Sequence, residues 1–263
     1  MSHQKEPVLI IERKQHVAYM TLNRPKVLNA LSAELLLSLK DELDKIKNDG
    51  DIKGIFIIGS GEKAFSAGAD IEFLNSSSPM QVRTLAELAI SVNSQIENLG
   101  KISIALINGF ALGGGLELAE SCMLRVAVSS AKLGHPEVRI GAVAGWGGTT
   151  RLPRLIGKGR ATELLLTGNM ISAEKAFEMG LVNLVVDSDN LQSEGEKLME
   201  EILCNAPISV NLTWEAIHRG LNLPLEESAK LGGDYFGLIA STDDFREGTK
   251  SFLNKVKPAY VGK

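Results

Sequence analysis

The sequence predicts an α/β protein built around a parallel β-sheet. Two apolar runs, residues 54–58 and Ile102–Ile107, have the length and β-rich composition of buried strands. The segment between them, residues 82–99, carries apolar side chains at the spacing of one helix face. Because a strand, a crossover helix and a second strand usually pair in parallel, we expect both strands in one sheet.

The N-terminal segment predicts two short strands, residues 8–12 and 17–21, followed by a helix that Ser32 opens. The apolar residues on one face of that helix are Leu35, Leu36, Leu39, Leu43 and Ile46. The turn-forming residues 49–51 end the helix just before the first buried strand. This pattern is typical of an amphipathic helix.

Strand and helix signals continue toward the C-terminus. A glycine-rich turn follows Ile102–Ile107 and leads to a short helix at 116–121 and a strand at 124–129. Beyond about Trp146 the sequence is mostly helical. Four helices succeed one another at the end of the chain: residues 191–204, 209–220, 226–239 and 245–255. Helices without a sheet of their own must bury their apolar faces against the core or another subunit, so we predict a homo-oligomer.

The composition excludes several classes of protein. The chain has 263 residues, 44% hydrophobic and 23% charged, which suits one large globular domain or a domain with an appended subdomain. A net charge of −4 without a basic cluster argues against a nucleic-acid partner. No uncharged apolar run reaches the roughly 18 residues of a membrane span. Cys122 and Cys204 lack zinc or disulfide spacing, and no targeting signal is evident, so a cytoplasmic protein without a metal site is expected.

Two glycine-rich turns each follow a buried strand, at residues 65–70 and 113–117. The first amides of a helix have no partner inside the helix, and the helix dipole favours negative charge there. Two such turns side by side could form an oxyanion hole, which enolate chemistry requires. The alternative is that the glycines only permit tight turns and close packing.

Two glutamates accompany these turns. Glu117 lies one helical turn after Gly114, and Glu137 follows Pro136 in the segment 134–137. Two carboxyl groups close to a polarised carbonyl suit general acid–base catalysis on a water and a carbon atom. The alternative is that both glutamates lie on a solvated surface.

Three motifs together carry a resemblance to a known family. Residues 65–71 (FSAGADI), 108–117 (NGFALGGGLE) and 134–148 (GHPEVRIGAVAGWGG) resemble the core motifs of the crotonase, or enoyl-CoA hydratase/isomerase, superfamily, and the likeness extends over nearly the whole chain. It implies a crotonase-like (ClpP/crotonase) ββα spiral core over residues 1–200, with the CoA site and active site. It also implies a C-terminal helical trimerisation region over residues 201–263, giving a trimer or a dimer of trimers.

The resemblance implies a 2-enoyl-CoA hydratase with defined site residues. Glu117 corresponds to the base toward water, and Glu137 to the acid that protonates the α-carbon. The backbone amides of Ala67 and Gly114 correspond to the oxyanion hole, and the backbone of Gly145 to a position that holds the water. The implied contacts to the acyl-CoA substrate are Lys26, Val27, Leu28, Ala67, Gly68, Ala69, Asp70, Ile71, Gly113 and Pro136. No metal and no separate cofactor is implied, because coenzyme A is part of the substrate.

Some positions depart from the commoner family pattern. Ala144 stands where many hydratases have proline, Leu116 where cysteine is frequent, and Ile102-Ser103 where Lys-Pro is usual. Trp146 stands where a small residue is usual, so an aromatic ring beside the acyl site could shorten or reshape the pocket.

Other interpretations of these residues remain. Residues 59–64 fit the dinucleotide fingerprint G-x-G-x-x-G/A, but the expected helix does not follow at once. Within the family, a Δ3-Δ2 enoyl-CoA isomerase or another acyl-CoA enzyme is the alternative, although retention of both glutamates favours hydration. A non-catalytic member would have lost Glu117, Glu137 or Gly114. We expect Asp70 to cap a helix and His135 to be a structural neighbour of Glu137.

Overall fold

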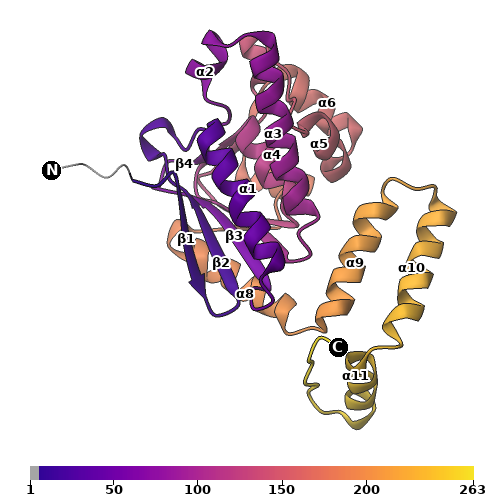
Figure 1. Cartoon of the computed structure of the whole chain (residues 1–263). Coiled ribbons are helices and arrows are strands. Elements are labelled where there is room, and N and C mark those ends of the chain that lie inside the picture. Colours follow the sequence, from indigo (N-terminus) through magenta and orange to yellow (C-terminus); the bar gives the residue numbers. More distant parts are fainter. Residues whose placement is uncertain (1–5) are drawn as a thin grey trace. The chain divides into compact units, whose positions relative to one another are not determined.

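The computed structural model describes residues 6–263 (Figure 1). The chain divides into two compact units, with the boundary between Gly195 and Glu196. This boundary lies a few residues before the expected one at 200/201, inside helix α8 (Leu191–Leu203). The roles expected for the two parts remain predictions.

A six-stranded sheet forms the centre of the first unit. In spatial order its strands are β1 (Leu9–Lys14), β2 (Val17–Leu22), β3 (Gly54–Gly59), β5 (Ile102–Ile107), β7 (Leu124–Val128) and β10 (Leu184–Val186). Strand β1 is antiparallel to β2, and all other neighbours are parallel. The parallel pairing expected for the two apolar runs is confirmed, with Gly54 opposite Ile102. Every residue of β5 is buried, which explains its uninterrupted apolar sequence.

A second, four-stranded sheet contains short strands that the sequence did not predict. Its order is β4 (Ala64–Ser66), β6 (Phe110–Leu112), β8 (Lys132–Gly134) and β9 (Met170–Ser172). Three-residue strands are too short to give a periodic signal. Because β4 begins at Ala64, the last residue of the segment 59–64, no helix opens there, and the dinucleotide alternative lacks its structural context.

The two sheets are related by a repeated ββα pattern. In the pairs β3–β4, β5–β6 and β7–β8 the first strand joins the large sheet and the second joins the small one. Helical segments follow each pair before the chain returns to the large sheet. The prediction of a crotonase-like ββα spiral core in an α/β protein is confirmed.

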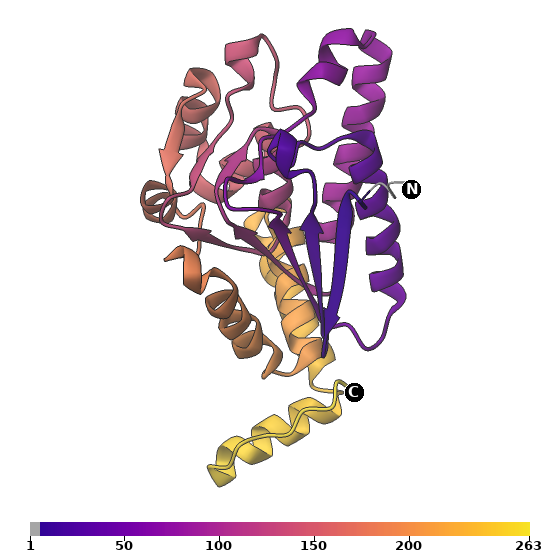
Figure 2. The same cartoon turned by 90° about the vertical axis from the view of Figure 1, so that its left-hand side faces the viewer.

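The first unit also contains helical segments. They are η1 (Pro25–Val27), α1 (Ala33–Asn48), α2 (Ile71–Ser76), α3 (Pro79–Glu97), α4 (Gly114–Ser121), η2 (Glu137–Ile140), α5 (Gly148–Ile156), α6 (Lys158–Thr167), α7 (Ala173–Met179) and η3 (Ser188–Asn190). Of these, α1, α3 and α7 begin at a serine N-cap. Ser32 accepts a hydrogen bond from Leu35 N at 3.3 Å and so caps α1 as expected. Ser78 and Gln81 form a capping box that starts α3. Helices α1 and α3 pack side by side on one face of the large sheet (Figures 1 and 2).

Within the second unit, three complete helices follow α8: α9 (Pro207–Gly220), α10 (Leu225–Ile239) and α11 (Asp243–Asn254). The predicted succession of C-terminal helices without a strand is therefore confirmed. Helices α9 and α10 form a hairpin (Figure 1). Large apolar side chains are solvent-exposed on this unit, among them Leu225, Phe236, Phe252 and Leu253.

Candidate active site

The two glycine-rich turns lie against each other in the first unit. Gly68 has φ +97°, and a Cβ atom on it would lie only 3.2 Å from Gly114 N and 2.8 Å from Leu112 O. A Cβ atom on Gly115 would lie 2.3 Å from Ser66 O. Glycine is therefore required for the approach of the 65–70 turn to the start of α4, and this approach brings the two sets of amides together.

The structure does not offer the amide of Ala67 to a ligand. Ala67 N–H donates to Leu28 O at 2.9 Å, so the expectation that it forms half of an oxyanion hole does not hold. The amides of Ala69 and Gly114 make no hydrogen bond to any of residues 6–263. Because Ala69 directly follows Gly68, these two amides are neighbours and form the available donor pair.

The segments expected to bind CoA also lie together. Leu28 O accepts from Ala67 N, and Leu31 N donates to Gly68 O at 2.8 Å. Lys26 and Val27, in the adjoining η1, are exposed, as is Ile71 at the start of α2. The segments 26–28 and 67–71 are thus adjacent in the first unit.

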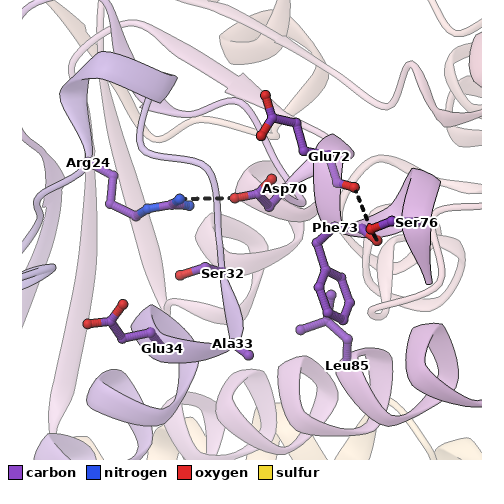
Figure 3. A pocket seen from close by; sticks show the side chains of 9 residues that line it. All are labelled: Arg24, Ser32, Ala33, Glu34, Asp70, Glu72, Phe73, Ser76 and Leu85. Atoms are coloured by element: carbon purple, nitrogen blue, oxygen red, sulfur yellow. Dashed lines mark hydrogen bonds and ion pairs between the residues drawn. The ribbon is translucent and has the colours of Figure 1, made fainter.

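Asp70 occupies the N-cap position of α2 as expected, but its side chain makes no capping hydrogen bond. Its Oδ2 instead pairs with Arg24 Nη2 at 3.0 Å, and both side chains are about one-fifth exposed. Figure 3 shows this ion pair at one wall of a pocket of about 460 Å³. The pocket is lined by Arg24, Ser32, Ala33, Glu34, Asp70, Glu72, Phe73, Ser76 and Leu85.

A smaller pocket of about 270 Å³ adjoins the first, since both include Ala33, Phe73 and Leu85. Its other lining residues are Met80, Gln81, Thr84 and Leu88 of α3. Neither lining includes Glu117 or Glu137. One lining residue of the larger pocket, Asp70, directly follows Ala69, whose amide is free, in the sequence.

Glu117 is almost completely buried, with 1% of its surface exposed. Its Oε1 accepts two backbone hydrogen bonds, from Trp146 N at 2.8 Å and Gly148 N at 2.7 Å. Burial raises the pKa of this carboxyl from 4.5 to about 7, although the Gly148 amide and His135 act in the opposite direction. The side chain is therefore held in one orientation and ionises close to neutral pH.

Glu137 lies in η2, directly after its N-cap Pro136. A Cβ atom on Gly113 would lie 3.0 Å from Glu137 Oε1, so this carboxyl reaches the residue that opens α4. Its Oε2 is buried and has no hydrogen-bond partner among the described residues. The negative charge of Glu137 raises the pKa of Glu117, so the two carboxyl groups are near each other. Both lie around the N-terminus of α4, as the motifs predicted.

Sequence reasoning missed Glu120 and gave His135 no more than a structural role. Both are buried, and His135 Nε2 lies 2.9 Å from Glu120 Oε1. His135 Nδ1 lies 3.6 Å from Glu137 Oε1, so the expected contact with Glu137 is present. Burial lowers the pKa of His135, but Glu120 and Glu137 raise it by more, to about 10. The signal that could have found Glu120 is its position three residues after Glu117, on the same helix face.

The segment 144–148 borders the candidate site next to Gly114 and Glu117. Trp146 is 8% exposed, and a Cβ atom on Gly114 would lie 2.4 Å from its ring atom Cζ3. Trp146 O accepts from Asn93 Nδ2 and from Arg151 Nη1, each at 3.1 Å, which fixes the segment. Gly145 is exposed, and its amide makes no hydrogen bond to the described residues, so it is available to a water molecule.

Residues 6–263 contain neither a metal-ligand cluster nor a membrane-spanning helix. No group of three or more His, Cys, Asp or Glu side chains in this range could hold a metal ion. No helix in the same range has both the length and the apolar character needed to span a membrane.

Comparison with known proteins decides the family. The sequence model of the enoyl-CoA hydratase/isomerase family matches residues 12–263. The chain belongs to this family. The resemblance predicted from the three motifs is thereby confirmed.

Individual members of the enoyl-CoA hydratase/isomerase family are similar over their whole length. A crotonyl-CoA hydratase of Syntrophomonas wolfei is 42% identical over 97% of this chain and 98% of the relative. A short-chain-enoyl-CoA hydratase of Clostridium acetobutylicum is 39% identical over 95% of both chains. The crystal structure of an enoyl-CoA hydratase from Bacillus anthracis superposes with a TM-score of 0.93 at 38% identity and covers 97% of this chain and 100% of that one.

Proposed function

We propose that this member of the family is a 2-enoyl-CoA hydratase that converts short-chain 2-enoyl-CoA thioesters to 3-hydroxyacyl-CoA. One observation carries the proposal: the carboxyl groups of Glu117 and Glu137 lie around the same helix N-terminus as the free amides of Ala69 and Gly114. Two donors for a developing enolate and two acid–base groups are what water addition to a conjugated thioester requires.

The proposed mechanism assigns a role to each group. Ionised Glu117 removes a proton from water, the hydroxide bonds to the β-carbon, and the electrons of the double bond move onto the thioester oxygen. The amides of Ala69 and Gly114 stabilise this enolate oxygen. Glu137 then gives a proton to the α-carbon, which restores the carbonyl. Gly145 N–H helps to hold the water, and the proton on Glu117 returns to the acid side before the next turnover.

CoA is proposed to bind along residues 26–28 and 67–71, with Gly113 and Pro136 next to the acyl thioester. The exposed Lys26 supplies a positive charge for the phosphate groups. Arg24 and Asp70 neutralise each other, so their ion pair orders this surface and adds no net charge.

A short acyl chain is proposed because of Trp146. Its ring lies against Gly114, next to the proposed position of the thioester carbonyl, and this bulk shortens the space beyond the double bond. The similar proteins of Syntrophomonas and Clostridium bear the names crotonyl-CoA hydratase and short-chain-enoyl-CoA hydratase.

The test is a panel of 2-enoyl-CoA and 3-enoyl-CoA thioesters followed by absorbance and mass spectrometry. Crotonyl-CoA should lose its enone absorbance and gain the mass of one water. Glu117→Gln and Glu137→Gln should each lower kcat by about two orders of magnitude or more. Wild-type turnover in both variants would contradict the assigned roles.

The alternative activity is Δ3-Δ2 isomerisation, for which a single carboxyl group can shuttle the proton. The same panel separates the two reactions, because a 3-enoyl-CoA that is isomerised keeps its mass while its double bond shifts. Unchanged mass for every 2-enoyl-CoA, with rapid conversion of 3-enoyl-CoA, would favour the isomerase.

A homo-oligomer, as a trimer or a dimer of trimers, is also proposed. The support is the set of large apolar side chains exposed on the second unit, including Leu225 at 86% and Phe252 at 83%. Light scattering coupled to size exclusion should give a mass three or six times that of the chain. A stable monomer would contradict this proposal.

The reaction is proposed to need no metal or separate cofactor, in a cytoplasmic location. Turnover should survive dialysis against EDTA, and a loss that an added divalent ion restores would contradict the first point. Both cysteines are unpaired, which agrees with a reducing compartment. Cell fractionation of the native host tests the location.

A further inference from the structure

Behind Glu137 lies a buried row of ionisable groups that the mechanism above leaves unused. Glu120 of α4 and His135, which precedes Pro136, have side chains that are 0% and 1% exposed. They meet at 2.9 Å, and the other ring nitrogen of His135 faces Glu137 Oε1 at 3.6 Å. The imidazole of His135 therefore lies between two carboxyl groups and connects Glu120 to Glu137.

The hydrogen bonds of these three side chains restrict where their protons lie. Neither Glu120 Oε2 nor His135 Nδ1 has a hydrogen-bond partner within the described chain. His135 Nε2 lies 2.9 Å from Glu120 Oε1, and a buried carboxylate needs a hydrogen-bond donor, so Glu120 requires a proton on His135 Nε2. A second proton shared by these groups then lies either on His135 Nδ1 or on the carboxyl group of Glu137, since Nδ1 and Glu137 Oε1 face each other.

We propose that Glu120 and His135 form a proton relay behind Glu137, in which His135 stores the proton that Glu137 delivers to the α-carbon. His135 is thus a positioning residue that acts through Glu137, and the inference rests on the proposed hydratase function.

The relay conserves protons. At rest Glu120 is ionised, His135 is an imidazolium and Glu137 is ionised. As the α-carbon takes a proton from Glu137, Nδ1 of His135 passes its proton to Glu137, and the imidazole becomes neutral while keeping Nε2–H toward Glu120. Water has meanwhile given one proton to Glu117. Transfer of that proton from Glu117 through Glu137 to Nδ1 of His135 restores the resting state.

The charged groups around His135 favour this resting state. Glu117 and Glu120 of α4 and Glu137 of η2 face the ring or its neighbours, while Arg125 of β7 and Arg151 of α5 interact with these acids. The two carboxylates in contact raise the pKa of His135 to about 10. His135 is therefore protonated at neutral pH. In the same pH range Glu117, with a pKa of about 7, becomes an effective base.

The first test observes the proton directly. In protein labelled with ¹⁵N-histidine, the free wild-type enzyme at pH 8 should show His135 with both ring nitrogens protonated. The signal is assigned by its absence from the Glu120→Gln/His135→Gln variant. A neutral His135 at pH 8 in an enzyme that hydrates crotonyl-CoA would overturn the relay and leave the hydratase function intact. A wild type that hydrates no thioester would overturn the function, and the delivery step with it.

The second test separates the relay from mere packing. His135→Gln alone leaves Glu120 as an unpaired buried charge and could unfold the protein, so the matched variant is Glu120→Gln/His135→Gln, which removes both charges. We expect it to fold, to keep KM within about twofold, and to lose about 10²-fold or more in kcat. Its basic limb should move to lower pH, because no imidazole then stores the proton.

A merely structural role predicts a different outcome. Assayed at a temperature at which it is folded, the double variant would then keep the wild-type kcat. It would also keep the basic limb of the wild-type pH–rate profile, and this result would overturn the proposal. Glu42→Gln, which removes a buried glutamate of α1 paired with Arg13 and Lys45, serves as the control for loss of a buried charge elsewhere.

Discussion

Replacing Glu117 by glutamine should lower kcat by about two orders of magnitude or more and yet make the protein more stable at alkaline pH. The carboxyl group is 1% exposed, and burial raises its pKa from 4.5 to about 7. Glutamine keeps the oxygen that accepts the Trp146 and Gly148 amides but carries no charge to desolvate. The variant therefore separates the cost of burying the charge from the geometry that holds the side chain.

The sign and size of the effect follow from linkage. A carboxyl whose folded pKa lies above its unfolded value contributes stability that is fully present below about pH 4.5 and is lost as the pH rises through about 7. At about 1.4 kcal/mol per pKa unit, the complete loss is about 3 kcal/mol, of which about 2–3 kcal/mol falls between pH 5 and pH 8. The Glu117→Gln variant has no carboxyl group at this position, so its free energy of unfolding does not fall in this way as the pH rises.

The assay is urea unfolding of both proteins at equal concentration at pH 5 and pH 8. The variant's free energy of unfolding, relative to wild type, should rise by about 2–3 kcal/mol from pH 5 to pH 8. Glu62→Gln, at an exposed loop position, controls for the removal of one negative charge. An equal difference at both pH values, or a variant less stable than wild type only at pH 8, would refute the reasoning.

Three further predictions concern the acyl pocket, the packing of α4 and the oligomer. Trp146→Ala should raise kcat/KM for an eight-carbon 2-enoyl-CoA relative to crotonyl-CoA by about tenfold or more, because the ring against Gly114 is removed; an unchanged ratio would exclude Trp146 as the limit on chain length. Gly115→Ala should lower the free energy of unfolding by about 1–3 kcal/mol, because its Cβ would lie 2.3 Å from Ser66 O; Gly50→Ala, with nothing within 4 Å, is the matched control. Leu225→Asp with Phe236→Asp should lower the oligomeric mass in light scattering, since charges replace exposed apolar side chains on α10, and a mass unchanged from wild type would place the interface elsewhere.

Strands β1, β2, β3, β5 and β7 of the large sheet and the long helices could be predicted, because their residues carry a periodic or continuous apolar signal. The three-residue strand β10 was not predicted, since the sequence beyond Trp146 was expected to be mostly helical. Strand β5 has the predicted bounds Ile102–Ile107, and α1 begins directly after the predicted Ser32. The second sheet could not be predicted, because β4, β6, β8 and β9 have three residues each. Their positions depend on pairing between segments far apart in the sequence, such as Ala111 with Leu133.

The candidate site was predicted in outline and corrected in one position. Residue spacing placed Glu117 and Glu137 near the amide end of α4, as the structure has them. It could not decide which amide of the 65–70 turn is free, because the hydrogen bond from Ala67 goes to Leu28, whose carbonyl is presented by a backbone with φ 52°. Whether a backbone amide is free depends on hydrogen bonds throughout the fold. Sequence spacing can therefore identify the turn that supplies an oxyanion-hole amide, but not the residue.

The segment 144–148 links three properties of the proposed enzyme that are separate in the sequence. Its amides at Trp146 and Gly148 orient Glu117, its amide at Gly145 is free for water, and its indole ring lies against Gly114. The first two functions use backbone atoms, whereas the third uses a side chain. Substitution at residue 146 can therefore change the space for the acyl chain while the base and the water keep their hydrogen-bond donors. By the same reasoning, a change in backbone path, such as a residue inserted between 145 and 148, should impair acid–base chemistry for every substrate alike.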